Sequence, residues 1–206
     1  MKGSIITISF FITGCLVGTT GLVHFDVHNA SVYVLYVLML LIGANIGGNM
    51  DLKAFVGQLN FKTLLVPIAT ITGTAIFAAL GAIILSQWSV FDCMAVGSGL
   101  CYYSVSSMLI AQLKSPSLGV QLATELSTIA LLANIIREMT ALVAAPLIRK
   151  YFGTLAPISA AGMSSGDVAL NAVAKYSGKE VVPIAIVHGI LVNLSVPFIV
   201  SMFCNM

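Results

Sequence analysis

Arg137 and Glu138 stand side by side within one of the most apolar stretches of the chain, residues 121–148. Placing an ionisable side chain at bilayer depth costs roughly 2.5–3.5 kcal/mol on scales derived from membrane insertion. Side chains of this kind persist there when they face a cavity, a partner or a transported charge. The pair therefore favours a role in moving a solute across a membrane.

The two charges cannot pair simply along their own helix, because consecutive residues point about 100° apart. Glu138 instead shares a helix face with Asn134, four residues earlier. A carboxyl near the centre of a span suits a group that binds alternately a proton and a cationic substrate. The alternative is a structural ion pair in which Arg137 or Glu138 binds another helix.

The composition indicates an integral membrane protein. The 206 residues are 59% hydrophobic and 8% charged, whereas soluble domains carry about 25% charged residues. The sequence has no dinucleotide or nucleotide loop and no zinc-protease or serine-hydrolase motif, so we expect neither an enzyme nor a cofactor. The four cysteines lack the spacing of metal ligands. The sequence also lacks the basic patch that would indicate nucleic-acid binding.

Five apolar regions have the length of a membrane span, and two more are interrupted. We expect an all-α polytopic protein with five crossings at residues 4–23, 31–49, 63–86, 121–148 and 181–203. Residues 93–113 are broken at Gly97 and Gly99, and residues 155–175 are broken at 162–166. Paired glycine-interrupted segments point to a transporter's binding site, so both are predicted to be re-entrant or discontinuous. The alternative is two kinked helices that cross fully, which gives seven crossings.

Loop charge favours the five-crossing arrangement. With a cytoplasmic N-terminus, one cation falls outside, Lys114, while the following fall inside: Lys2, Lys53, Lys62, Arg149, Lys150, Lys175 and Lys179. In the seven-crossing arrangement Arg149 and Lys150 move outside, against the bias. With five crossings the two broken segments approach from opposite faces, as alternating access requires.

Polar residues in the broken segments are candidate substrate contacts, and their exposed backbone N–H groups could hold a carboxylate. The candidates are Ser98, Tyr103 and Ser104 in the first segment, Ser164, Ser165 and Asp167 in the second, and His188 in the last span. Each has a structural alternative. Tyrosines gather at membrane interfaces, Asp167 could cap a helix N-terminus, and His188 could bond a backbone carbonyl.

Several stretches resemble the lysine exporter family LysO: GSGLCYYSVSSMLIAQL, LLANIIREMTALVAAPLIRK, SAAGMSSGDVALNAVAKYSGKEVVPIAIVHGILVNLSVPFIV and LLIGANIGGNMDL. The resemblance covers nearly the whole chain. It implies export of L-lysine, and of analogues such as thialysine, across a bacterial cytoplasmic (inner) membrane, with Glu138 at a position that serves transport. The family's usual pattern around Asp167 differs here, because Asp167 is displaced relative to Met163 and the usual proline is missing.

Typical members of that family begin with a further apolar module, which we do not find in residues 1–206. We therefore expect one integral membrane transport domain that works with a small, separately encoded membrane subunit. Because lysine is cationic, the predicted reaction is export coupled to proton antiport. A monovalent cation/proton antiporter and a non-transporting membrane subunit are the alternatives. Assembly into a homo-oligomer is left open.

Overall fold

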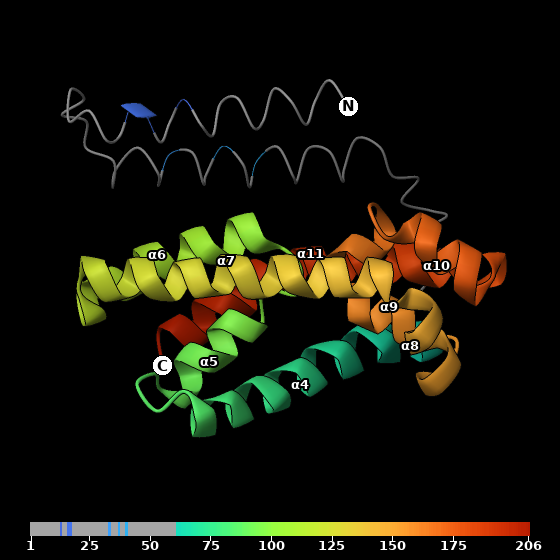
Figure 1. The fold of residues 1–206 in the computed structure, drawn as a ribbon, viewed down its shortest axis with the longest axis horizontal. Coiled ribbons are helices and arrows are strands. Elements are labelled where there is room, and N and C mark those ends of the chain that lie inside the picture. Colours follow the sequence, from blue (N-terminus) through green and yellow to red (C-terminus); the bar gives the residue numbers. More distant parts are fainter. Residues whose placement is uncertain (1–12, 14–15, 18–32, 34–36, 38–39, 41–60) are drawn as a thin grey trace. The chain divides into compact units, whose positions relative to one another are not determined.

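The computed structural model describes residues 13, 16–17, 33, 37, 40 and 61–206 (Figure 1). The chain forms two compact units, Met1–Val34 and Leu35–Met206. Apart from isolated positions, the expected spans 4–23 and 31–49 lie outside the described residues. A single transport domain over 1–206 stays a prediction.

Three long helices run through the described part of the second unit: α4 (Phe61–Ile84), α7 (Val120–Val143) and α11 (Val182–Cys204). The stretches Thr63–Ile84, Val120–Val143 and Lys179–Cys204 are long and apolar enough to cross a membrane. Many of their large apolar side chains are exposed, as expected for helices that face lipid. These helices, together with the family assignment below, make the chain a membrane protein, and every element among residues 61–206 is helical.

The first interrupted segment forms two helices, α5 (Val90–Gly97) and α6 (Tyr103–Leu118). Ser89 and Asp92 form a capping box that starts α5. The Nζ atom of Lys114, near the end of α6, lies 2.7 Å from Oδ1 of Asp92. Because this salt bridge joins the beginning of α5 to the end of α6, the segment returns to the end from which it starts.

The second interrupted segment contains α9 (Ala156–Ala161), the 3-10 helix η1 (Gly162–Gly166) and α10 (Leu170–Ser177), followed by η2 (Lys179–Val181). A short helix, α8 (Ala145–Phe152), packs against both α9 and α10. Figure 1 shows α8 and α10 near one end of α7 and the beginning of α5 near the other. The two broken segments thus approach the middle of the long helices from opposite ends, while the number of membrane crossings stays a prediction.

The apolar run 121–148, expected as one regular span, is divided between two helices. The long helix ends at Val143, and Ala144 is both its C-cap and the N-cap of α8. Pro146 lies in the first turn of α8. Its ring clashes with the carbonyl four residues earlier, and it has no N–H to donate, so a continuous helix stops before it.

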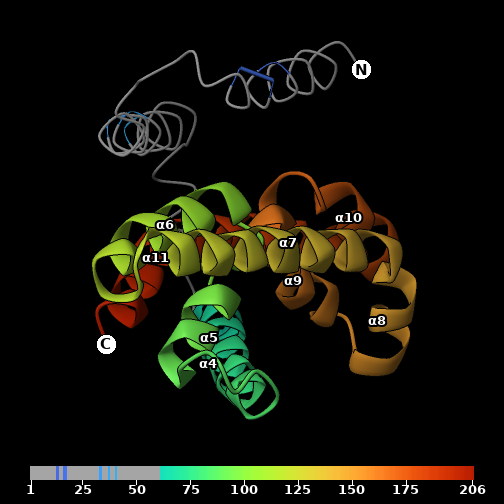
Figure 2. The ribbon, with the colours of Figure 1, turned by 60° about the vertical axis from the view of Figure 1, so that its left-hand side comes forward.

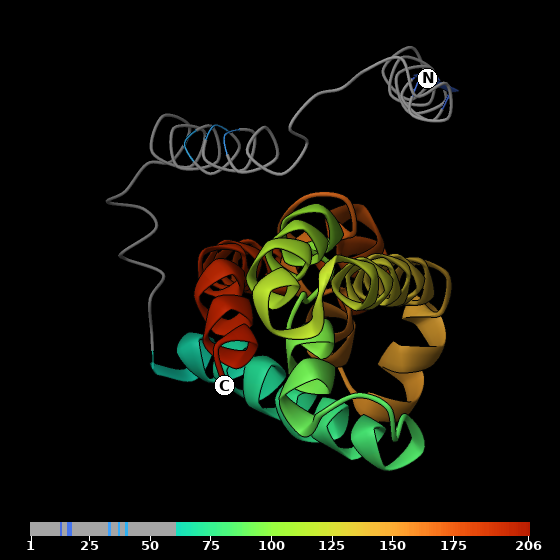
Figure 3. The ribbon, with the colours of Figure 1, turned by 90° about the vertical axis from the view of Figure 1, so that its left-hand side faces the viewer.

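Two large apolar clusters flank a more polar middle layer. One contains Trp88 and Ile110 together with Val196 and Cys204 of α11, and the other contains Val66, Ile158 and Val173. Figures 2 and 3 show α6 beside α7, with α4 and α5 together below them. On α4 and α11, Thr70 and His188 lie between residues of the two clusters.

Candidate functional site where the two broken segments meet

The interruptions of the two broken segments contact each other directly. The amide N–H of Met163 in η1 donates to the carbonyl of Leu100 over 2.9 Å. Leu100 and Cys101 both have positive φ angles, 46° and 72°, which non-glycine residues seldom adopt. Gly162 has φ 57°, and a Cβ atom there would lie 2.4 Å from the Leu100 carbonyl oxygen. Glycine is therefore required at this crossing.

Asn134 of α7 holds the first interruption from both sides. Its Oδ1 accepts from the Cys101 N–H over 3.0 Å, and its Nδ2 donates to the carbonyl of Val96 over 3.1 Å and of Ala130 over 2.8 Å. The side chain is 2% exposed. Gly99 leaves room for it, since a Cβ atom there would come 2.4 Å from Nδ2. The Asn134 side chain thus binds the backbone on both sides of the break, and its third bond stays within α7.

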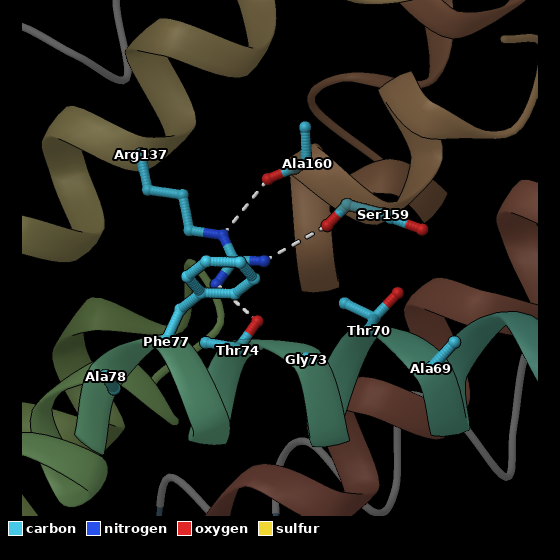
Figure 4. Close-up of a pocket in the computed structure, with 9 residues that line it drawn as sticks. All are labelled: Ala69, Thr70, Gly73, Thr74, Phe77, Ala78, Arg137, Ser159 and Ala160. Carbon is cyan, nitrogen blue, oxygen red and sulfur yellow. Dashed lines mark hydrogen bonds between the residues drawn. The ribbon is translucent and has the colours of Figure 1, made fainter. Parts of the chain in front are cut away.

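Arg137 lies one residue before Glu138 and reaches across to α9 and α4 (Figure 4). Its Nε–H donates to the carbonyl of Ala160 over 3.1 Å, and Nη2 donates to that of Ser159 over 3.0 Å. Nη1 donates to Oγ1 of Thr74 over 3.3 Å. The carbonyls at the C-terminal end of a helix carry partial negative charge, so they suit a guanidinium. Arg137 thereby fastens α7 to the second broken segment.

Glu138 is partly buried and does not pair with its neighbour Arg137. Among residues 61–206, the only salt bridge joins Lys114 to Asp92. The charged group of the described residues that acts on the Glu138 carboxyl is the Asp167 carboxylate. Two carboxylates close to each other attract a proton or a cation between them. The ion-pair alternative for Glu138 therefore finds no partner in the described part of the chain.

A buried hydroxyl–imidazole network connects η1 to α4 and α11. His188 is fully buried, with Nε2 3.1 Å from Oγ1 of Thr70 and Nδ1 3.0 Å from Oγ of Ser165. The Thr70 hydroxyl donates to the Val66 carbonyl over 2.8 Å. It must therefore accept from Nε2–H, which leaves Nδ1 as an acceptor. The Ser165 hydroxyl then faces two acceptors at 3.0 Å, Nδ1 and the Ala185 carbonyl.

Asp167 is exposed, and it does not cap a helix. The N-cap of α10 is Ala169, and no side chain caps it. The Asp167 carboxylate instead accepts from the N–H of Val168. The residue also borders a small cavity of about 130 Å³ beside α11, where the buried Oδ1 of Asn193 has no partner among the described residues. The helix-capping alternative for Asp167 is therefore wrong.

Comparison with known proteins places this architecture in one family. The family model described as the lysine exporter LysO matches residues 8–204. The chain belongs to the LysO family. It is 29% identical over 195 residues to Lysine exporter LysO of Escherichia coli strain K12, an alignment that covers 93% of this chain and 61% of that protein. The chain therefore spans about three fifths of that relative's length.

A second LysO relative is the Haemophilus influenzae protein named "Putative lysine exporter". It is 28% identical over 183 residues, which cover 88% of this chain and 87% of that protein. No solved structure matches the chain.

Of the remaining residues predicted from the sequence of this LysO chain, two are buried and two are exposed. Ser98 is 1% exposed, and its hydroxyl has no partner among the described residues. Tyr103 and Ser104 begin α6 with exposed side chains and have no side-chain hydrogen bond to the other candidates within residues 61–206. Ser164 is buried, and its hydroxyl donates to the Ala161 carbonyl over 2.8 Å. A substrate role for each of these residues stays a prediction.

Sequence reasoning missed Thr70 and Thr74, the two α4 residues that contact His188 and Arg137. Their spacing carried a usable signal, since residues four apart share a helix face. They were overlooked because threonine in an apolar helix commonly bonds its own backbone, as Thr70 also does. Among the described residues no cluster of three or more His, Cys, Asp or Glu side chains could hold a metal ion.

Proposed function

We propose that this chain is a secondary transporter that exports L-lysine, and analogues such as thialysine, from a bacterial cytoplasm in exchange for protons. Its membership of the LysO family and the names of its two relatives support amino-acid export. The observation that carries the proposal is the position of Glu138: partly buried in a candidate span, under the influence of the Asp167 carboxylate, with no cationic partner in residues 61–206.

The exchange follows from the charges. Lysine has a net positive charge, and moving one such charge outward against an inside-negative potential costs about 2.3 kcal/mol per 100 mV. Proton entry can offset that cost. In the proposed cycle the ionised Glu138 binds an ammonium group of lysine from the cytoplasm. After lysine leaves, a proton from outside neutralises Glu138 while the empty carrier returns.

The contact between the two broken segments provides the element that moves. Residues with unusual backbone angles persist only where surrounding contacts hold them, and such sites are common in switching regions. Here the Leu100 carbonyl, the Met163 amide and Asn134 hold the interruptions together. Separation of the two interruptions would open the Glu138 side to one face of the membrane and then to the other.

The proposal is tested in cells that lack their own lysine exporter and are fed a lysine-containing dipeptide. Expression of this chain should lower intracellular lysine and raise lysine in the medium, and a collapse of the proton gradient should slow the efflux. Unchanged intracellular lysine, with the chain and any co-purifying membrane subunit verified in the membrane, would reject lysine export. The separately encoded membrane subunit and a homo-oligomer stay predictions, which co-purification from the same cells would test.

A further inference from the structure

A cleft lies beneath Arg137, and the proposed cycle does not use it. It has a volume of about 590 Å³ and lies between α4, α7 and α9. Small residues of α4, Ala69, Gly73 and Ala78, form much of its wall, together with Phe77 and the Thr74 hydroxyl. Figure 4 shows the guanidinium of Arg137 spanning this space from α7 toward α4.

The guanidinium of Arg137 keeps hydrogen-bonding capacity that residues 61–206 do not use. It has five N–H donors, of which three are engaged, with Ala160, Ser159 and Thr74. Nε and Nη2 bind the two α9 carbonyls along one edge, so the donors that remain belong to the two terminal nitrogens. Such a pair matches the two oxygens of a carboxylate.

The charge of Arg137 is also uncompensated within residues 61–206. Carbonyl oxygens and a hydroxyl are its bonded partners, and no carboxylate of the described residues lies within salt-bridge distance of it. A charge held away from water without a counter-ion is costly, whereas a paired and hydrogen-bonded one is tolerated. The site therefore favours an anionic group that can enter and leave the cleft.

The serine-rich interruptions are less suited to that anion. The hydroxyls of Ser164 and Ser165 already donate to protein acceptors, the Ala161 carbonyl and the Ala185 carbonyl or His188, and both residues are buried. We propose that the α-carboxylate of the amino-acid substrate binds Arg137 in the α4–α7–α9 cleft. This inference rests on the proposed transport of an amino acid, and it assigns the carboxylate to Arg137 rather than to the interruptions.

The test compares ligands that differ in one group, using the purified full chain. Lysine has the carboxylate, lysinamide replaces it with an amide, and norleucine keeps it but lacks the ε-ammonium. We expect lysine and norleucine to raise the thermal unfolding temperature of the wild type more than lysinamide does. In Arg137→Gln a charge-assisted bond to the carboxylate is lost. The ratio of the apparent Kd for lysinamide to that for lysine should therefore fall about tenfold or more. An unchanged preference would overturn the inference.

A second variant guards against misfolding of Arg137→Gln. A Cβ atom at Gly73 meets nothing within 4 Å, so the side chain of Gly73→Leu can start there without a clash and adds bulk to the cleft. It should abolish stabilisation by lysine and norleucine, while Gly81→Leu on the same helix, also with free space, should keep it. Retained norleucine binding in Gly73→Leu would contradict the carboxylate site. Absence of lysine efflux with these ligand preferences intact would reject the proposed transport instead.

Discussion

The Met163 amide donates to the Leu100 carbonyl over 2.9 Å, so the two interrupted segments are joined where each loses its regular helix. One segment approaches from each end of the long helices α4, α7 and α11. Their backbone groups at this point cannot use helical partners, and groups left unpaired away from water are costly. The crossing resolves this by pairing one interruption with the other and with Asn134.

Replacing Gly162 should damage this crossing. In Gly162→Ala the new Cβ would lie 2.4 Å from the Leu100 oxygen at a φ of 57°, so the Leu100–Met163 bond must lengthen or break. We expect a loss of about 1–3 kcal/mol in the free energy of unfolding, measured by thermal denaturation in detergent. Gly81→Ala, in open space inside α4, is the control and should be neutral or stabilising. Equal effects of the two substitutions would contradict the crossing's importance.

Removing the Asn134 amide should leave three backbone groups without their side-chain partner. Asn134→Ala frees the buried Cys101 N–H and removes the side-chain donor from the carbonyls of Val96 and Ala130. Each buried group that loses its partner costs about 1–3 kcal/mol. Thr140→Ala on the same helix is a matched control, because Thr140 is exposed and bonds its own helix. A melting temperature for Asn134→Ala like that of Thr140→Ala would show that the interruption between α5 and α6 keeps its conformation without the Asn134 side chain.

The Asp92–Lys114 pair should close the first broken segment. The side chains are 5% and 9% exposed, and removing one partner of a buried pair typically costs about 3–5 kcal/mol. Lys114→Met should therefore destabilise the protein strongly, whereas Lys150→Met, in an exposed residue of α8, should not. Comparable unfolding temperatures for the two variants would show that the segment does not depend on the pair.

The same pair predicts a dependence of stability on pH. Burial alone would raise the pKa of Asp92, but hydrogen bonds from Lys114 and Ser89 and the Lys114 charge outweigh burial and hold that pKa below its usual value. A carboxyl of this kind stabilises the fold above its unfolded pKa of about 3.9, and the contribution is lost as pH falls through the lower, folded value. Thermal denaturation between pH 7 and 3 should show wild-type stability falling in acid. The Asp92→Asn variant should lack that component of the acid loss.

The three long helices followed from the sequence because each is an uninterrupted apolar run, and the observed bounds agree closely with the expected spans at 63–86 and 181–203. The two interruptions followed from glycine. Their details did not. The residues with positive φ in the first break are Leu100 and Cys101 rather than Gly97 or Gly99, because hydrogen bonds from distant residues impose that conformation.

The candidate site was predictable in its charged residues and not in their partners. Arg137 and Glu138 are conspicuous in an apolar run, but the Arg137 partners Ser159 and Ala160 contribute backbone carbonyls, which leave no mark on the sequence. His188 was recognised as polar, whereas its contacts with Thr70 and Ser165 depend on how three elements pack. Long-range packing of this kind cannot be derived from spacing along one chain.

The most direct test of the account is lysine efflux from proteoliposomes that contain the chain, together with any membrane subunit that co-purifies with it, carrying either Glu138→Gln or Glu125→Gln. Glu125 lies on the same helix and is exposed, so it controls for the loss of one carboxylate. The account predicts that Glu138→Gln abolishes lysine efflux and its acceleration by an inward proton gradient, while Glu125→Gln keeps both. Proton-coupled lysine efflux at the wild-type rate in Glu138→Gln would contradict the account.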